Sequence, residues 1–121
     1  MTLVLVVDDE PLLRRLIESV LLDEGYDVMV AGTGRDMLDI LETTHPDIVL
    51  LDVMMPGIDG IEAFLTMRTR PALQRIPVIM MSAAMTSRTL KSHAIAAFIA
   101  KPFDLDILLE TVDSVLRTPD A

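Results

Sequence analysis

Five short apolar runs alternate along the chain with segments that carry apolar residues at helical spacing. The runs are Leu3–Val7, Asp27–Val30, Ile48–Leu51, Val78–Met81 and Ala96–Ala100. Apolar runs of this length favour strands that are buried on both faces of a sheet. Strands that alternate with helices over short loops predict a doubly wound α/β fold, in which helices cover both faces of a five-stranded parallel sheet.

The helical segments are marked by apolar periodicity and by residues that start or stop helices. The expected segments are Pro11 to near Gly25, about Met37 to Leu41, Gly60 to Met67, a weaker one from about Thr86 to His93, and a last one after Asp104. Asp59 and Asp104 are expected to cap the helices that follow them. Pro71 to Arg75 is expected to form a surface turn.

Length and composition indicate one globular domain over residues 1–117, with a loose tail at 118–121. The chain has 121 residues, of which 51% are hydrophobic. Its net charge of −9 argues against direct binding to nucleic acid or to an anionic membrane surface. Without cysteine it has neither disulfides nor a thiolate metal site. No apolar run approaches the roughly 18 residues of a membrane span. We therefore expect a soluble, cytoplasmic domain.

The central apolar run ends at a carboxylate. Asp52 directly follows Ile48–Leu51, and the turn-forming stretch Met55-Pro56-Gly57 comes next. In open α/β sheets, ligands bind beyond the carboxyl ends of the strands. Asp52 is therefore a candidate ligand-binding residue, although an aspartate that merely caps a turn would produce the same local pattern.

Four of the five runs end in a polar residue suited to phosphate chemistry. They end at Asp8-Asp9, Asp52, Ser82 and Lys101. In a parallel sheet these ends converge on one edge, where crowded carboxylates favour a hard cation such as Mg²⁺. A carboxylate nucleophile, a magnesium ion, a lysine and a hydroxyl can together stabilise a phosphoryl group in transfer. Taken singly, each has a simpler explanation, as a helix-dipole partner, a turn residue or a surface lysine.

The motifs at these strand ends resemble those of a known family over about Leu3–Leu116. The motifs are Val7-Asp8-Asp9-Glu10, Leu51-Asp52-Val53-Met54-Met55-Pro56-Gly57-Ile58-Asp59-Gly60, Met81-Ser82-Ala83 and Lys101-Pro102-Phe103. Together they resemble the CheY-like receiver (REC) domain of two-component response regulators. The resemblance implies a flavodoxin-like sheet in the order 2-1-3-4-5. It also implies a cis peptide bond between Lys101 and Pro102.

The same resemblance implies a role for each residue at the strand ends. Asp52 would accept a phosphoryl group from a phosphohistidine of a histidine kinase or a histidine phosphotransfer protein. Asp9, Asp52 and the backbone carbonyl of Met54 would bind Mg²⁺ directly, with Asp8 acting through water. Ser82 and Lys101 would contact the phosphoryl oxygens, and Phe98 would be the aromatic residue of the switch. The domain would then change its contacts with a downstream protein or effector domain, without being a turnover enzyme.

The sequence departs from the family pattern after the fourth strand. Lys101 follows Ser82 by only 19 positions, which is shorter than usual by about one helical turn, and Ala94–Ala97 replaces the usual Gly-Ala-Asp segment. We therefore expect a fourth helix that is short, shifted or mobile. Met54 and Ala84, two residues beyond Asp52 and Ser82, cannot orient an attacking water, which predicts slow self-dephosphorylation.

Other functions remain as alternatives. The main one is a receiver-fold interaction module that signals without phosphorylation, which the departure after the fourth strand keeps open. A haloacid-dehalogenase-like phosphatase is disfavoured because Met54 stands where that class needs a second aspartate. A flavodoxin-like cofactor carrier is disfavoured because the acidic stretch from Asp8 to Glu10 would repel a phosphate. His45 and His93 are expected to be ordinary surface residues.

Overall fold

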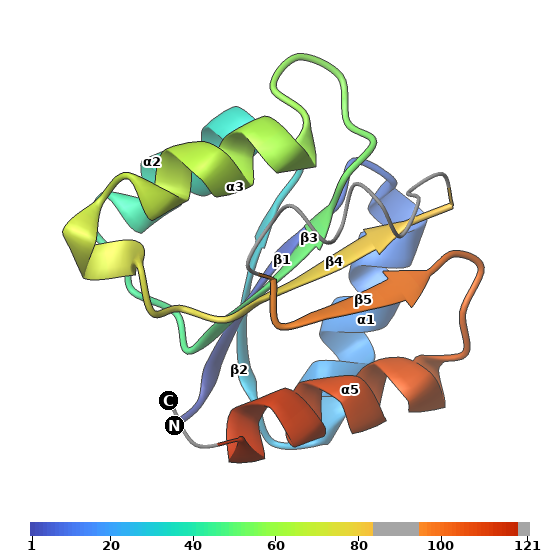
Figure 1. Cartoon of the computed structure of the whole chain (residues 1–121). Helices are drawn as coiled ribbons and strands as arrows, with labels where there is room; N and C mark the ends of the chain where they lie inside the picture. Colours follow the sequence, from blue (N-terminus) through green and yellow to red (C-terminus); the bar gives the residue numbers. More distant parts are fainter. Residues whose placement is uncertain (84–94, 119–121) are drawn as a thin grey trace.

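Five parallel strands form a single sheet in this computed structural model, which describes residues 1–83 and 95–118. The strands are β1 (Leu3–Val7), β2 (Asp27–Ala31), β3 (Ile48–Asp52), β4 (Val78–Ser82) and β5 (Ala97–Ala100). They lie in the order β2-β1-β3-β4-β5, so the chain reverses its direction of winding after β2 (Figure 1). The predicted fold class and strand order are confirmed.

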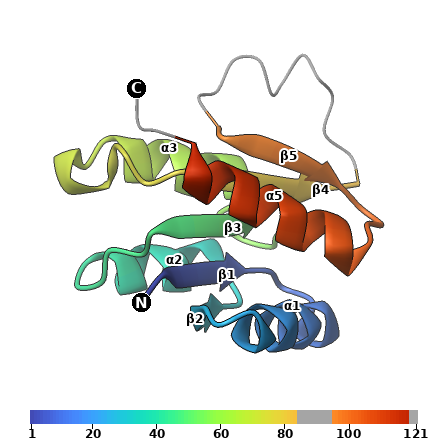
Figure 2. The same cartoon turned by 90° about the horizontal axis from the view of Figure 1, so that it is seen from below.

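Helices cover both faces of this sheet. They are α1 (Pro11–Asp23), α2 (Gly34–Leu41), α3 (Gly60–Arg68) and α5 (Leu105–Arg117), with a short 3₁₀ helix, η1 (Pro71–Leu73). Helices α2 and α3 pack together on one face, and α1 and α5 lie side by side on the other (Figure 2). The fourth helix expected at about Thr86–His93 lies outside the described residues, as do Ala84 and the end of the tail.

The alternation of side chains along the central strands explains why both faces need cover. In β1, Leu5 and Val7 join the core beneath α2 and α3, whereas Val4 and Val6 join the core beneath α1 and α5. All four side chains are completely buried. A strand with apolar residues on both faces is stable only between two layers, so the apolar runs dictate the three-layer architecture.

Two of the strands continue for one polar residue beyond their apolar runs. Asp52 is the last residue of β3, paired with Met81, and Ser82 is the last residue of β4, paired with Ala100. Both polar residues are therefore held by the regular sheet rather than by a loop. In the part of the chain that the structure describes, no helix is long and apolar enough to span a membrane.

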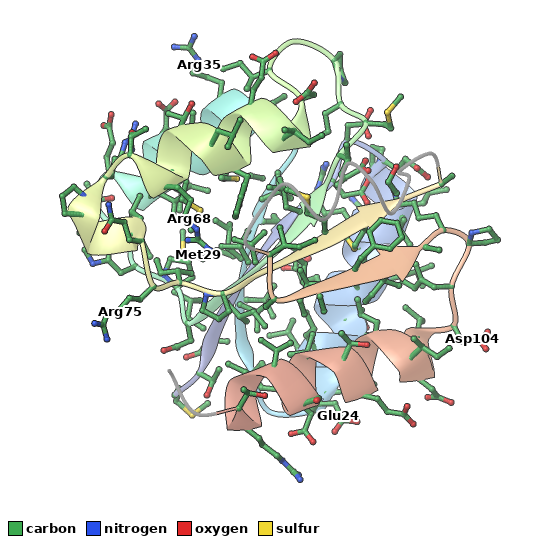
Figure 3. The ribbon with its side chains drawn as sticks, in the orientation of Figure 1. Glu24, Met29, Arg35, Arg68, Arg75 and Asp104 are labelled. Carbon is green, nitrogen blue, oxygen red and sulfur yellow. The ribbon has the colours of Figure 1, made fainter. Side chains whose placement is uncertain are left out.

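The two predicted helix caps differ in their contacts. Asp59 precedes α3, and its Oδ1 accepts a hydrogen bond from the Glu62 N–H at 2.9 Å. Asp104 occupies the equivalent position before α5, but its exposed side chain points outward and makes no capping hydrogen bond (Figure 3). The predicted start of both helices is confirmed, whereas the predicted side-chain cap at Asp104 is wrong.

This difference gives a matched pair of variants. We expect Asp59→Ala to lower the free energy of unfolding by about 1 kcal/mol more than Asp104→Ala does. Each variant loses a negative charge near a helix N-terminus, so the difference isolates the capping hydrogen bond. Urea denaturation of the two variants measures it, and equal losses would contradict the assignment.

Candidate functional site

The polar strand ends converge at one edge of the sheet. Asp8 follows β1, Asp52 ends β3, Ser82 ends β4 and Lys101 follows β5. The arrows of β3, β4 and β5 in Figure 1 all point toward this edge. Asp8, Asp52 and Ser82 are 0%, 2% and 1% exposed, although all three are polar. Because burial of a carboxylate is costly unless it is paired, their surroundings must supply partners.

Lys101 is the partner that joins the acids from two strands. Its Nζ lies 3.0 Å from Asp8 Oδ2 and 3.4 Å from Asp52 Oδ2. A third carboxylate, Glu10 Oε1, lies 3.3 Å away on the outer side. The Lys101 side chain is only 13% exposed, so little water screens these attractions. Its backbone N–H also donates to the Ser82 carbonyl at 3.1 Å, which links the ends of β4 and β5.

The acid-rich turn after β1 is held by its own backbone. Asp8 Oδ1 accepts a hydrogen bond from the Glu10 N–H at 2.9 Å, and the Asp8 N–H donates to the Ala31 carbonyl at 3.1 Å. The Asp8, Asp9 and Glu10 side chains each place one carboxylate oxygen within 4.8 Å of the others. The predicted candidates did not include Glu10. Its position next to two candidate acids was the only signal, and its contact with Lys101 depends on the tertiary fold.

The donor set at this edge fits a magnesium ion. Carboxylate oxygens from the turn after β1 lie close together, and Asp52 faces the same lysine from β3. Hard oxygen donors without cysteine or histidine are those that Mg²⁺ prefers. Asp52 does not belong to the three-residue acid cluster, and the Met54 N–H donates to Asp52 Oδ1 at 3.3 Å. The predicted direct ligands Asp9, Asp52 and the Met54 carbonyl stay a prediction.

The electrostatics of the site raise the pKa of Asp52 to about 6. Burial is the main cause, and the neighbouring charge of Asp8 and a hydrogen bond with Asp9 act in the same direction. Lys101 and the Met54 N–H oppose the rise in pKa without cancelling it. An ionised Asp52 is therefore an unfavourable state that an additional cation would relieve.

The pKa of Lys101 also lies above its usual value. Burial alone lowers that pKa, but the three carboxylates around the ammonium group outweigh burial. The ammonium group therefore stays charged at neutral pH and can donate charge-assisted hydrogen bonds to anionic oxygens.

The loop after Asp52 depends on two glycines. Gly57 has φ of 77°, a conformation that other residues rarely adopt. The Gly60 N–H donates to the Val53 carbonyl at 2.9 Å, and a Cβ atom at residue 60 would fall 2.7 Å from the Val53 Cα. Helix α3 can therefore begin directly against the loop that holds Asp52 only because residue 60 has no side chain.

Comparison with known proteins agrees with this geometry. A family model described as the response regulator receiver domain matches residues 4–113. The chain belongs to this family. The receiver domain is 38% identical to sporulation initiation phosphotransferase F of Bacillus subtilis, over 93% of the chain and 92% of that protein.

Other relatives are longer proteins. The regulatory protein AtoC of Escherichia coli is 38% identical over 94% of the chain, which spans 25% of AtoC. The sensor histidine kinase RcsC of Escherichia coli is 40% identical over 91% of the chain, which spans 12% of RcsC. The chain also spans only about half the length of several other curated relatives. Receiver domains similar to this one therefore occur within both regulators and kinases.

Solved receiver structures superpose closely. The chemotaxis protein CheY4 of Vibrio cholerae has a TM-score of 0.89 at 29% identity, with 95% of this chain and 98% of that chain covered. The response regulator TrrA of Thermotoga maritima has a TM-score of 0.84 at 34% identity, with 95% and 99% covered. The TrrA structure is a complex with Mg²⁺ and BeF.

The other predicted features of this receiver domain lie on β5, directly after β5, and in the loop after β3. Phe98, partly buried on β5 and paired with Met80, lines a pocket of about 470 Å³ between β5 and α5. The Met54 side chain is 62% exposed at the rim of the site. A second pocket, of about 350 Å³, opens beside Glu10 and Lys101. The predicted cis bond between Lys101 and Pro102 is confirmed.

Proposed function

We propose that this receiver domain accepts a phosphoryl group on Asp52 from the phosphohistidine of a histidine kinase or phosphotransfer protein. The reaction depends on Mg²⁺, takes place in the cytoplasm, and alters contacts with a downstream protein or effector domain. The observation that carries the proposal is the buried Asp52 carboxylate, which lies 3.4 Å from Lys101 Nζ at the carboxyl edge of a receiver-domain sheet.

The chemical step is a displacement at phosphorus. An Asp52 carboxylate oxygen attacks the phosphorus atom, a P–O bond forms, and the P–N bond to the donor imidazole breaks. The electron pair of that bond returns to the imidazole ring. Lys101 then offers its charge to the phosphoryl oxygens, and the Ser82 hydroxyl offers a rotatable donor. A bound Mg²⁺ ion, held by the acid-rich turn, Asp52 and the Met54 carbonyl, would neutralise negative charge on the same oxygens.

Phosphorylation would change the charge balance around Lys101. Before the reaction, its ammonium group is shared among Asp8, Glu10 and Asp52. A phosphoryl group on Asp52 adds anionic oxygens that compete for the same donor and for the Ser82 hydroxyl. Movement of Ser82 toward the phosphoryl group would alter the space next to β5, where Phe98 packs. Such a local charge change can bias a two-state equilibrium that exposes a different surface.

The proposal predicts a single, metal-dependent phosphorylation. We expect intact-mass measurement after incubation with Mg²⁺ and acetyl phosphate to show one added phosphoryl group. The addition should disappear in Asp52→Asn and in wild-type protein treated with a chelator. Stoichiometric labelling without release of many phosphates per protein would also separate a receiver from a turnover phosphatase. A folded protein that binds Mg²⁺ but gains no mass would favour the phosphorylation-independent interaction module.

The phosphorylated protein is expected to lose its phosphoryl group slowly. Met54 offers no hydrogen-bonding group that could orient a water molecule toward phosphorus. Replacing it with asparagine adds such a group, so Met54→Asn should hydrolyse faster by a factor on the order of 10. The decay of the phosphorylated mass after removal of acetyl phosphate measures this rate. Leu65→Asn, at an exposed position on α3, is the control, and equal rates in all three proteins would contradict the role of Met54.

A further inference from the structure

We propose that Arg14, together with the space left by Gly32, positions the acid-rich turn of residues 8–10 for Mg²⁺. This inference rests on the proposed function, because it concerns the residues assigned there to the metal. Arg14 lies in α1, and Gly32 lies in the loop after β2. Neither residue has a side chain that can bind a metal ion, so we expect any effect of their side chains on the metal to act through the turn.

Arg14 holds the turn at one point with its side chain, in addition to the helical backbone hydrogen bond that any residue at this position makes. Its Nη1 donates a hydrogen bond to the Asp8 carbonyl oxygen at 2.8 Å, and its backbone N–H donates to the Glu10 carbonyl oxygen at 2.9 Å. The Asp8 carbonyl belongs to the planar peptide unit that joins Asp8 to Asp9. Fixing this oxygen therefore restrains the peptide plane that ends at the Asp9 Cα, which is one of the two planes that set the direction of the Asp9 side chain.

Gly32 provides the room that the Arg14 guanidinium group occupies. A Cβ atom at residue 32 would fall 3.1 Å from Arg14 Nη1 and 3.8 Å from Arg14 Cζ. The nearer of these atoms is the nitrogen that holds the Asp8 carbonyl. The backbone of Gly32 does not have positive φ, so alanine can adopt its conformation. The missing side chain, rather than backbone freedom, is therefore what Arg14 requires at this position.

The positioning role and the charge of Arg14 have opposite effects on a cation. The guanidinium charge repels Mg²⁺, so its removal alone would strengthen Mg²⁺ binding. Loss of the hydrogen bond to Asp8 would loosen the turn and weaken Mg²⁺ binding. Lysine keeps the charge but lacks the planar fork of arginine. Arg14→Met and Arg14→Lys therefore separate the two effects.

The test is the Mg²⁺ dissociation constant of the full chain, measured by calorimetry without any phosphodonor. We expect Arg14→Lys to bind Mg²⁺ roughly 10-fold more weakly, as is typical when the partner of a metal ligand is lost. Arg14→Met should also bind more weakly than wild type, but by a smaller factor than Arg14→Lys, because it loses the repelling charge as well. Gly32→Ala should weaken binding by a smaller factor. The double variant Arg14→Met/Gly32→Ala should bind no more weakly than Arg14→Met alone, because both changes break the same contact. Arg15→Met, at the exposed neighbouring arginine, controls for charge.

Each outcome decides for or against the inference. Mg²⁺ binding by Arg14→Met that equals or exceeds that of wild type would overturn it, as would additive losses in the double variant. A purely structural role would lower the free energy of unfolding without Mg²⁺ but leave the dissociation constant of the folded protein unchanged. If wild type is phosphorylated and the Arg14 variants bind Mg²⁺ normally, only this inference fails. If wild type binds no Mg²⁺, the proposed function fails together with it.

Discussion

Replacing Lys101 with methionine is expected to lower the free energy of unfolding of the metal-free protein by about 3 kcal/mol at pH 8. The substitution leaves the buried carboxylates of Asp8 and Asp52 without their shared cation. Methionine retains most of the apolar volume of the lysine stem, so the loss reports charge more than packing. Two acids that cannot both remain ionised in a buried site then oppose folding.

Urea denaturation without Mg²⁺ measures this loss. Arg117→Met is the matched control, because it also removes a cation from an ion pair. Arg117 lies 3.0 Å from Asp113, but the two side chains are 78% and 49% exposed. An exposed pair of this kind contributes at most about 1 kcal/mol. If Lys101→Met were no less stable than Arg117→Met, Lys101 would not stabilise the buried carboxylates of Asp8 and Asp52 as we propose.

The same variant should also be a poor phosphoacceptor. Lys101 is the one protein cation that contacts Asp52 among the described residues, so its removal takes away charge that would stabilise the phosphoryl oxygens. We expect the rate of phosphorylation by acetyl phosphate at saturating Mg²⁺ to fall at least about 100-fold. A rate close to that of wild type would show that phosphorylation does not require the lysine.

Much of this arrangement could be predicted from sequence because parallel strands impose a simple geometric rule. The carboxyl ends of parallel strands all lie along the same edge of the sheet, so the residues that follow the apolar runs lie there too. Asp8, Asp52, Ser82 and Lys101 could therefore be placed together without any knowledge of tertiary contacts. Burial on both faces likewise follows from runs such as Ile48–Leu51, which contain no polar residue.

The contacts between side chains of different elements could not be predicted in this way. The Glu10 carboxylate approaches Lys101 across 91 positions in sequence, and nothing local to either residue indicates the pairing. Asp104 illustrates the opposite failure, since it has the residue type and position of a cap but its side chain faces solvent. The requirement for glycine at residue 32 could not be predicted for the same reason as the Glu10 contact. It arises from the space that Arg14, a residue of another element, occupies. The local sequence pattern therefore predicts where a residue lies in the fold, whereas its side-chain partners depend on how the elements pack.

Replacing Asp52 with asparagine is expected to stabilise the metal-free protein increasingly as the pH rises. The pKa of Asp52 is about 6 in the folded protein against 3.8 for an ordinary aspartate. A raised pKa in the folded state contributes stability below pH 4, and that contribution is lost as the pH rises through about 6. Asparagine stays neutral throughout. The advantage of Asp52→Asn over wild type should therefore grow by roughly 2.4 kcal/mol between pH 4 and pH 8.

Urea denaturation across this pH range, with chelator present, tests the sign as well as the size of the effect. The same substitution at exposed Asp39 provides the comparison for an acid surrounded by water. An advantage that is constant with pH would contradict the raised pKa. Saturating Mg²⁺ should reverse the order of stability, because the ion binds the ionised carboxylate of the folded wild type and asparagine cannot replace that ligand. The buried negative charge of Asp52 therefore has two opposite effects. It lowers the stability of the metal-free protein, and it raises the affinity of the site for a cation.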